Sequence, residues 1–225
     1  MTQIPTRNST PSGNSLGFCT RTLLKLYSIW VSLTYPFASK GHGLSIHFTT
    51  ILPRAVAHRI KLGNSVLIKK DSWLNIPFEA EAEGEVNIII DDDCAIGSRN
   101  VISAKNLIHI ERDVIFGSSV LIMDHNHAYE NITLPIRKQG CTPGGTIRIE
   151  QGCWIGQGAA IVCSEGEVVI GRNCIIGPNS VVTKSVPPYS VIVGNPGRVA
   201  RQFDPAKAMW IGAGAGRAMP TESAR

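Results

Sequence analysis

The sequence predicts a mainly β protein that forms a solenoid, in which short parallel strands stack coil upon coil. Three observations support this fold class: large apolar residues recur every six positions in five runs, a mostly small residue stands four places after them, and glycine often follows directly. A single six-residue unit cannot bury its own apolar side chain, whereas stacked units form a continuous ladder. The five runs are Leu62, Ile68, Leu74; Ile90, Ile96, Ile102; Ile110, Phe116, Ile122; Ile149, Ile155, Ile161; and Ile170, Ile176, Val182.

The composition sets broad limits on the function. The chain has 225 residues, with 22 lysines and arginines against 17 acidic residues, and its 43% of hydrophobic residues exclude a wholly disordered chain. No apolar run reaches the ~20 residues of a membrane-spanning helix. Residues 1–70 hold nine basic and no acidic residues, so the net charge of +5 hides a mildly acidic remainder. This uneven charge predicts an anionic surface as a partner and no nucleic acid.

The two ends of the chain differ from the repeat. Residues 1–17 and 204–225 are predicted to be flexible tails, because they are rich in polar or small residues and lack periodicity. Residues 18–59 are predicted to form a basic amphipathic helical and linker region, with a helix over 18–37 that ends near Pro36. The polar stripe of this helix consists of Arg21, Lys25, Ser28 and Ser32. Two interpretations stay open: peripheral contact with a membrane, or packing on the rest of the protein or on another subunit.

The cysteines point to a reducing compartment. There are six of them and no C-x-x-C pair, so neither a zinc ribbon nor a redox pair is predicted. Cys94, Cys153 and Cys174 occupy small inward positions of the repeat. The sequence therefore predicts reduced, buried thiols in a cytoplasmic protein, which membrane contact would place at the inner face of the cell membrane.

Residues 60–203 resemble the hexapeptide-repeat acyltransferases. The resemblance is most specific between Asp124 and Arg201, in the stretches IRIEQGCWIGQGAAI and VVIGRNCIIGPNSVVTKSVPPYSVIVGNPGRVARQF. The nearest branch is that of the sugar O-acetyltransferases, which includes maltose, galactoside, nodulation-factor and envelope-glycan enzymes. The resemblance implies a left-handed parallel β-helix of triangular section over 60–203. It also implies a homotrimer with each site between two subunits, acetyl-CoA as co-substrate and no metal.

A polar insertion interrupts the repeat between Ile122 and Ile149. Its proline and glycine residues predict that 124–146 is a loop on one face of the solenoid that carries the active site. Acyl transfer to a hydroxyl needs a base, for which histidine is suited. In the family the catalytic histidine stands five places after the inward residue of its unit, which selects His127, with His125 as the second choice.

Further residues of this region are assigned to the acceptor side. Asp124, Asn126 and Tyr129 are predicted to contact the acceptor, although Asp124 could instead orient an imidazole or begin the loop. His109 stands 18 residues before His127 and is predicted to stack one coil beneath it if no residue is inserted. It would then support the catalytic imidazole or be a polar face residue without a role.

The resemblance also assigns the donor side. The family uses a backbone N–H in the turn after Trp-Ile-Gly to hold the thioester carbonyl, and here that group is the N–H of Gln157. Arginine and lysine near the end of the solenoid would bind the phosphates of coenzyme A. The predicted cofactor-binding residues are Trp154, Gly156, Gln157, Pro178, Thr183, Lys184, Arg198 and Arg201.

The expected function is acetyl-CoA-dependent O-acetylation of a sugar hydroxyl by direct transfer. Maltose- and galactoside-type enzymes begin with an acidic, polar helical segment, whereas this chain begins with an acid-free one, which favours an acceptor on a cell-envelope or exopolysaccharide glycan or its precursor. The alternatives are a non-enzymatic β-helix scaffold and a metal-dependent hydratase. The hydratase needs three metal ligands, and no third histidine follows His127 at a suitable spacing.

Overall fold

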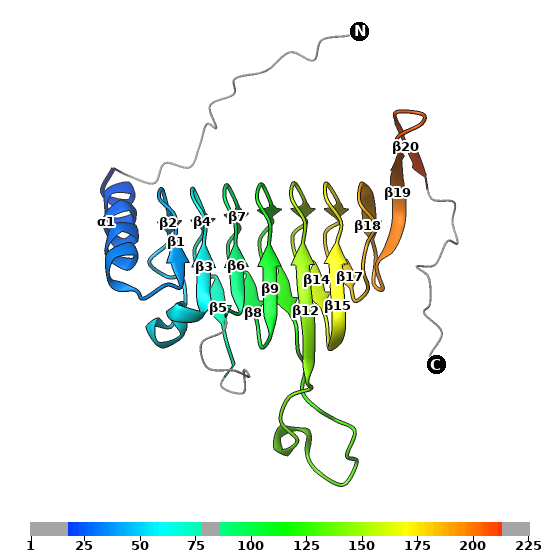
Figure 1. Cartoon of the computed structure of the whole chain (residues 1–225), viewed down its shortest axis with the longest axis horizontal. Helices are drawn as coiled ribbons and strands as arrows, with labels where there is room; N and C mark the ends of the chain where they lie inside the picture. The colour runs from blue at the N-terminus through cyan, green and yellow to red at the C-terminus, as the bar shows by residue number, and fades with distance from the viewer. Residues whose placement is uncertain (1–17, 78–85, 213–225) are drawn as a thin grey trace.

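Three sheets form the body of the molecule, and their strands are parallel except at the C-terminal end (Figure 1). The computed structural model describes residues 18–77 and 86–212. The first sheet contains β1 (Ser39–Lys40), β3 (Ile60–Leu62), β6 (Ile88–Ile90), β9 (Leu107–Ile110), β12 (Gly144–Ile149) and β15 (Glu165–Ile170). The second contains β2 (Ser45–Ile46), β4 (Leu67–Ile68), β7 (Ala95–Ile96), β10 (Ile115–Phe116), β13 (Trp154–Ile155), β16 (Ile175–Ile176), β18 (Ser190–Val193), β19 (Arg198–Asp204) and β20 (Met209–Gly212). The third contains β5 (Trp73–Asn75), β8 (Val101–Ser103), β11 (Leu121–Met123), β14 (Ala160–Val162) and β17 (Val181–Val182).

From β3 to β17, consecutive strands lie in different sheets, so the chain passes from the first sheet to the second, then to the third, and back to the first. Each strand pairs with its equivalent one coil later, as Ile122 does with Ile102 in the preceding coil and Ile161 in the following one. The predicted mainly β class and the parallel sheets are thus confirmed. The six-residue period arises because two residues of each unit form the strand and the others turn the corner.

The core consists of the predicted apolar ladders. Every residue of the five runs is buried, and none is more than 4% exposed. Burying an isoleucine side chain contributes roughly 1.5–3 kcal/mol, so each coil adds stability only when its neighbour covers it. The small residues four places later are buried as well, which lets the chain turn without leaving space in the core.

The corners between the first and second sheets require an unusual backbone conformation. The φ angle is 58° at Asp93, 61° at Asp113 and 53° at Asn173. Aspartate and asparagine adopt this left-handed region more readily than most residues do, because their short side chains bond to nearby backbone groups. The sequence thus places a tolerant residue where the chain has to turn.

The thiols inside the solenoid act as small packing residues. Cys94, Cys153, Cys163 and Cys174 are buried and form no disulfide. Burial raises the pKa of Cys94 to about 12, so this thiol stays protonated and donates a hydrogen bond to the Glu111 carbonyl at 3.0 Å.

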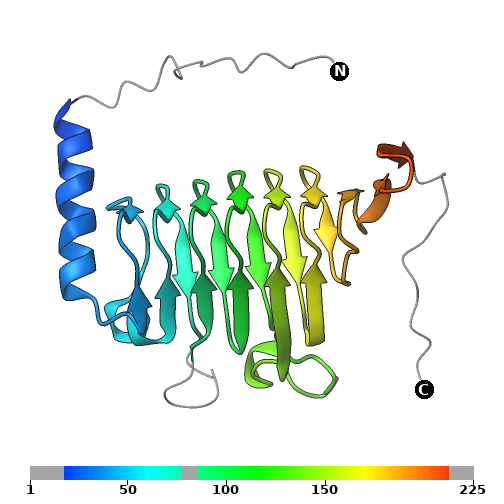
Figure 2. The same ribbon diagram turned by 45° about the horizontal axis from the view of Figure 1, so that its top comes forward.

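Helix α1 (Phe18–Thr34) lies across one end of the stack of coils, with its axis roughly at right angles to the direction of stacking (Figure 2). It ends before Pro36, as predicted. Val31 is 1% exposed, and the Ser28 hydroxyl accepts a hydrogen bond from the Ile46 N–H at 3.0 Å. The helix therefore closes the open end of the core.

The sheets extend beyond the predicted range of 60–203 at both ends. Strands β1 and β2 pair with β3 and β4, and a short 3-10 helix over Arg54–Arg59 leads into β3. At the other end β20 pairs antiparallel with β19, where a tail is predicted from residue 204. The rest of that tail, 213–225, and the N-terminal tail, 1–17, lie outside the described residues.

Candidate active site

An arm leaves the solenoid between β11 and β12, and it is the segment for which the sequence predicts an active-site loop (Figure 1). We define the arm as residues 124–143. Its two legs pair at their base: the Ala128 N–H donates to the Gly140 carbonyl at 3.0 Å, and the Thr142 N–H donates to the Asn126 carbonyl at 2.7 Å. His127 lies within this paired neck, in an antiparallel bridge with Cys141. The neck fixes the backbone of His127 relative to the solenoid.

Asp124 organises the root of the arm. Its side chain is 0% exposed and accepts hydrogen bonds from the backbone N–H groups of Lys105 at 2.7 Å and Asn106 at 2.8 Å. The same carboxylate lies 2.9 Å from Nδ1 of His125. The expectation that Asp124 contacts the acceptor is therefore wrong, because its oxygens are enclosed and engaged by the protein. It does orient an imidazole, but that of His125.

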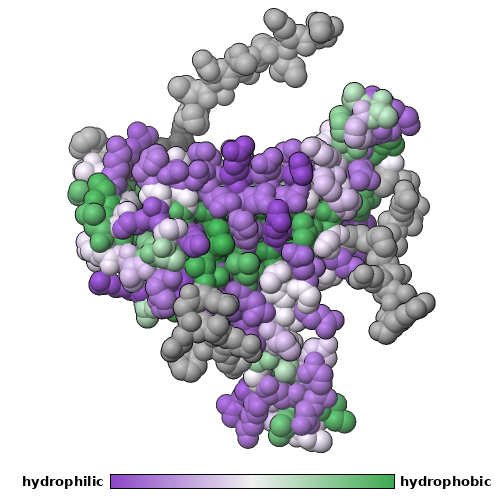
Figure 3. Space-filling view, viewed as in Figure 1, coloured by the Kyte–Doolittle hydropathy of each residue, from purple (hydrophilic) through white to green (hydrophobic). Residues whose placement is uncertain are grey.

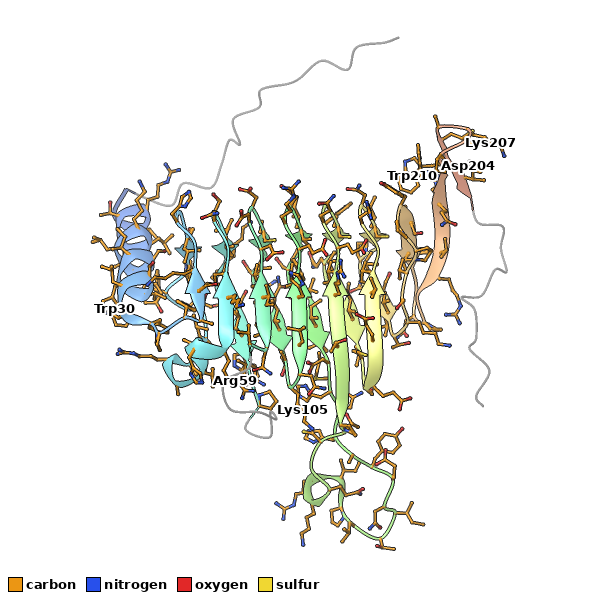
Figure 4. The ribbon with its side chains drawn as sticks, in the orientation of Figure 1. Trp30, Arg59, Lys105, Asp204, Lys207 and Trp210 are labelled. Atoms are coloured by element: carbon orange, nitrogen blue, oxygen red, sulfur yellow. The ribbon has the colours of Figure 1, made fainter. Side chains whose placement is uncertain are left out.

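Lys105 is a residue of this region that sequence reasoning missed. Its side chain is 5% exposed, and Nζ donates to the Thr142 carbonyl at 2.8 Å (Figure 4). The Thr142 hydroxyl in turn accepts the N–H of Asn126 at 3.0 Å. Nothing in the sequence marks this lysine, because 37 residues separate it from its partner. Only the folded chain shows that it supports the neck next to His127.

The two candidate bases differ in their access to substrate. The His127 side chain is exposed on the neck, whereas His125 is 7% exposed and tied to Asp124. Asn126 uses its Nδ2 to donate to the Ser164 hydroxyl at 2.6 Å, which links the arm to the next coil. Tyr129 is 66% exposed beyond the neck and is free to contact an acceptor.

His109 does not stack beneath His127, contrary to the prediction. It lies on β9, opposite Arg148 of β12, and its Nε2 is 2.9 Å from Oδ2 of Asp91. The prediction assumed 18 residues per coil, but 20 residues separate Ile102 from its partner Ile122. The corner before β9 contains the extra residues and shifts the register.

Gln157 lies at a different corner, between β13 and β14. The neighbouring N–H groups are used, since Gly156 donates to the Ile176 carbonyl at 2.7 Å and Gly158 to the Ser118 carbonyl at 2.9 Å. Among the described residues, no hydrogen bond uses the N–H of Gln157. A free backbone donor at an exposed corner can stabilise a developing negative charge on a bound carbonyl.

Two other predicted residues lie near this corner. Trp154 is 50% exposed on β13, where it can line a groove. Pro178 occupies the position equivalent to Gln157 one coil later, because Trp154 pairs with Ile175 and Ile155 with Ile176. Because proline has no N–H, any backbone contact of Pro178 with a cofactor is limited to its carbonyl.

His127 and Gln157 lie on different edges of the solenoid. The arm leaves the corner that joins the third sheet to the first, whereas Gln157 turns the corner from the second sheet to the third. Thr183 and Lys184 follow β17 and share the arm's corner, two coils further on. Within one chain, the predicted base and the predicted oxyanion donor therefore lie on separate edges.

Unpaired cations lie near the C-terminal end of the solenoid. Lys184, Arg198 and Arg201 are exposed, and none of them forms an ion pair with a carboxylate among the described residues. By contrast, Arg148 is bound to Glu111 at 2.7 Å. The three unpaired cations are available to an anionic ligand.

No group of three or more metal-binding side chains comes together in the part of the chain that the structure describes. Within the same residues, no helix is both long and apolar enough to cross a membrane.

Known proteins resemble this chain over most of its length. No family model matches it. Rv3034c of Mycobacterium tuberculosis, named a probable acetyltransferase, is 33% identical over 169 residues, which cover 72% of this chain and 48% of the relative. The chain thus spans about half the length of that relative. WbbJ of Escherichia coli K12, whose name assigns it to lipopolysaccharide biosynthesis as an O-acetyl transferase, is 26% identical over 157 residues, or 67% of this chain and 79% of the relative.

A solved structure shares the fold. A point mutant of AntD, an N-acyltransferase from Bacillus cereus crystallised with dTDP and coenzyme A, superposes with a TM-score of 0.62. The match covers 80% of this chain and 90% of AntD at 18% sequence identity. The resemblance to acetyltransferases is therefore confirmed by sequence with the curated relatives, and the likeness to AntD shows that the fold is shared.

Proposed function

We propose that this chain transfers an acetyl group from acetyl-CoA to a hydroxyl of a sugar, with His127 as the general base. The observation that carries the proposal is the exposed imidazole of His127 in the hydrogen-bonded neck of the arm. The arm contributes nothing to the apolar ladders of the core. Its polar, hydrogen-bonded neck therefore favours a catalytic role. The acetyltransferase names of Rv3034c and WbbJ support the same reaction class.

The reaction proceeds in a ternary complex. His127 takes the proton of the acceptor hydroxyl, and the oxygen forms a bond to the carbonyl carbon of the acetyl thioester. The carbonyl oxygen becomes an oxyanion that accepts a hydrogen bond from the N–H of Gln157. Collapse of this intermediate breaks the carbon–sulfur bond, and protonated His127 returns its proton to the thiolate of coenzyme A. No covalent intermediate on the protein is needed.

The site is shared between subunits of a homotrimer. The separation of His127 and Gln157 on two edges of one solenoid supports this, because a neighbouring copy can bring the two edges together. The outer part of the arm also exposes apolar side chains that a neighbouring copy would cover. They are Ile132 at 96%, Ile136 at 54%, at the start of a short 3-10 helix (Ile136–Lys138), and Leu134 at 46%.

Coenzyme A is proposed to lie between Gln157 and the C-terminal cations. Lys184, Arg198 and Arg201 have the charge to bind its phosphates, and none of them is neutralised by a carboxylate of the described chain. AntD, which shares the fold, was crystallised with coenzyme A. We also propose that the β-helix is left-handed. The three parallel sheets and the fold shared with AntD support this.

The acceptor is proposed to be a cell-envelope or exopolysaccharide glycan or its sugar precursor. The name of WbbJ refers to lipopolysaccharide biosynthesis, and AntD has been crystallised with dTDP-4-amino-4,6-dideoxyglucose. A cytoplasmic location fits the supply of acetyl-CoA and the four buried free thiols. An acceptor screen with radiolabelled acetyl-CoA across nucleotide sugars, oligosaccharides and lipid-linked sugars identifies the class. Absence of coenzyme A binding in calorimetry would favour the scaffold alternative instead.

The assignment of the base is tested with two alanine variants. His127→Ala should lower kcat by about 10²–10⁴-fold, because the hydroxyl loses its proton acceptor. His125→Ala is the matched control. It removes the imidazole bound to Asp124, so it should lower the melting temperature, while its kcat should stay well above that of His127→Ala. The measurement is the release of coenzyme A thiol in the presence of acceptor. Full turnover by His127→Ala, with loss in a folded His125→Ala variant, would reverse the assignment.

A further inference from the structure

Helix α1 presents an apolar face away from the solenoid. Its large exposed side chains are Leu23 at 52%, Leu26 at 60%, Ile29 at 55%, Trp30 at 50% and Leu33 at 77%. The space-filling view shows hydrophobic surface over this helix at the end of the molecule (Figure 3). Exposed apolar residues that cluster on one element are typical of interaction sites.

This face is not needed to hold the helix in place. The opposite side of α1 makes the contacts with the first coil through the buried residues Ser28 and Val31. A surface helix normally points its polar residues away from the core. Here the side that points away also contains large apolar residues, while Val31 and Tyr27 pack on the core, so the helix is apolar on both sides, unlike an ordinary surface helix.

Positive charge borders the apolar face. Arg21, Lys25, Ile29 and Leu33 follow one another at intervals of four residues, so two exposed basic side chains continue the same row of the helix surface. Lys40, at the other end of the helix, donates its Nζ to the Ser32 carbonyl. No acidic residue occurs in residues 1–70 to neutralise these charges. The combination of apolar and basic side chains is complementary to an anionic lipid surface.

Aromatic rings lie around the C-terminal half of α1. The ring centroids of Tyr27 and Trp30 are 5.8 Å apart, those of Trp30 and Tyr35 are 5.8 Å apart, and those of Tyr35 and Phe37 are 5.9 Å apart. Trp30, labelled in Figure 4, is half exposed in this cluster. Tryptophan and tyrosine are enriched where lipid headgroups meet water.

We propose that α1 binds an anionic bilayer, with Leu26, Trp30 and Leu33 inserted at the level of the headgroups. The helix lies across the end of the stack, so the coils extend away from the membrane (Figure 2). If the proposed homotrimer packs its solenoids side by side, three such helices face one membrane, and their binding is multivalent. A second copy of the chain is a poorer occupant of this face, because it would bring Arg21 and Lys25 of both copies together without a nearby acid.

Flotation of the full-length protein with vesicles tests the proposal. The wild type should float with vesicles that contain phosphatidylglycerol and much less with pure phosphatidylcholine. The double variant Leu26→Gln/Leu33→Gln should lower the bound fraction at least roughly tenfold, because it removes apolar area from the bilayer. The matched control is Met209→Gln, which changes a side chain that is 54% exposed at the opposite end of the solenoid and should float like the wild type.

The charge contribution is tested separately. Arg21→Gln/Lys25→Gln should weaken binding to anionic vesicles and reduce the sensitivity of binding to salt. Deletion of the helix is unsuitable, because it would remove the buried Val31 and uncover the end of the core at Ile46.

Equal flotation of the wild type and the double variant, or no flotation of the wild type, would overturn the proposal. So would a fall in oligomer mass in light scattering without a change in flotation, which would identify a second copy as the occupant. The assay uses no acceptor and no acetyl-CoA, so its failure is distinguishable from a failure of the proposed acetyl transfer.

Discussion

At the scale of single residues, the proposed oxyanion donor is a backbone N–H and not a side chain. The candidate oxyanion donor is the N–H of Gln157, and the equivalent position one coil later is already a proline, Pro178. The fold therefore already contains proline at the equivalent corner of the next coil. A single substitution can remove one backbone proton without disturbing the turn.

This equivalence leads to a prediction for Gln157. The variant Gln157→Pro should keep its melting temperature close to that of the wild type and lose about 10²–10³-fold in kcat, because only the N–H is lost. Gln157→Ala retains the N–H and should stay active. Steady-state kinetics of both variants with saturating acetyl-CoA provides the measurement. Equal activity of the two variants would exclude this N–H from catalysis.

At the scale of elements, the neck of the arm is supported by one buried ammonium group. Lys105→Met should lower the free energy of unfolding by about 1–3 kcal/mol, because the Thr142 carbonyl loses its charged partner. The variant should also lower kcat, since the neck that holds His127 becomes looser. Urea unfolding and kinetics measure the two effects. Lys61→Met, at an exposed position of β3, is the matched control and should change neither. An unchanged unfolding curve for Lys105→Met would contradict a supporting role.

The elements also show which features the sequence can predict. The ladders were predictable because burial demands an apolar residue at positions such as Ile122 and Ile161. A polar residue at one of these positions would disrupt its packing on the coils before and after it. Strand β1 was not predictable, since Ser39 and Lys40 are polar and exposed and are recognised only by their pairing with β3. The error at His109 has a similar origin, because extra residues in a corner change the register without changing the six-residue period.

The site was predictable to a smaller extent than the fold. The spacing from Ile122 selects His127, and the structure leaves its side chain exposed. The roles of Asp124 and Lys105 depend on contacts between segments far apart in the chain, which no local pattern records. These two roles can therefore be recognised only from the three-dimensional structure.

At the scale of the whole molecule, a shared site predicts complementation between two inactive variants. Subunits with His127→Ala lack the base, and subunits with Gln157→Pro lack the donor. If each site takes one group from each of two neighbours, equal mixing by refolding or co-expression should restore about a quarter of wild-type activity. Initial rates of the mixture measure this recovery. Each variant alone is the control, and a mixture no more active than the separate variants would place both groups in one chain.

The root of the arm has a consequence for how such proteins diversify. The Gly145 N–H donates to the Asp124 carbonyl at 2.7 Å, so the chain departs from the corner and returns to it at nearly the same point. Coils on either side keep their pairing, whatever the excursion contains. The length and sequence of the arm can therefore vary without a change in how the coils pair.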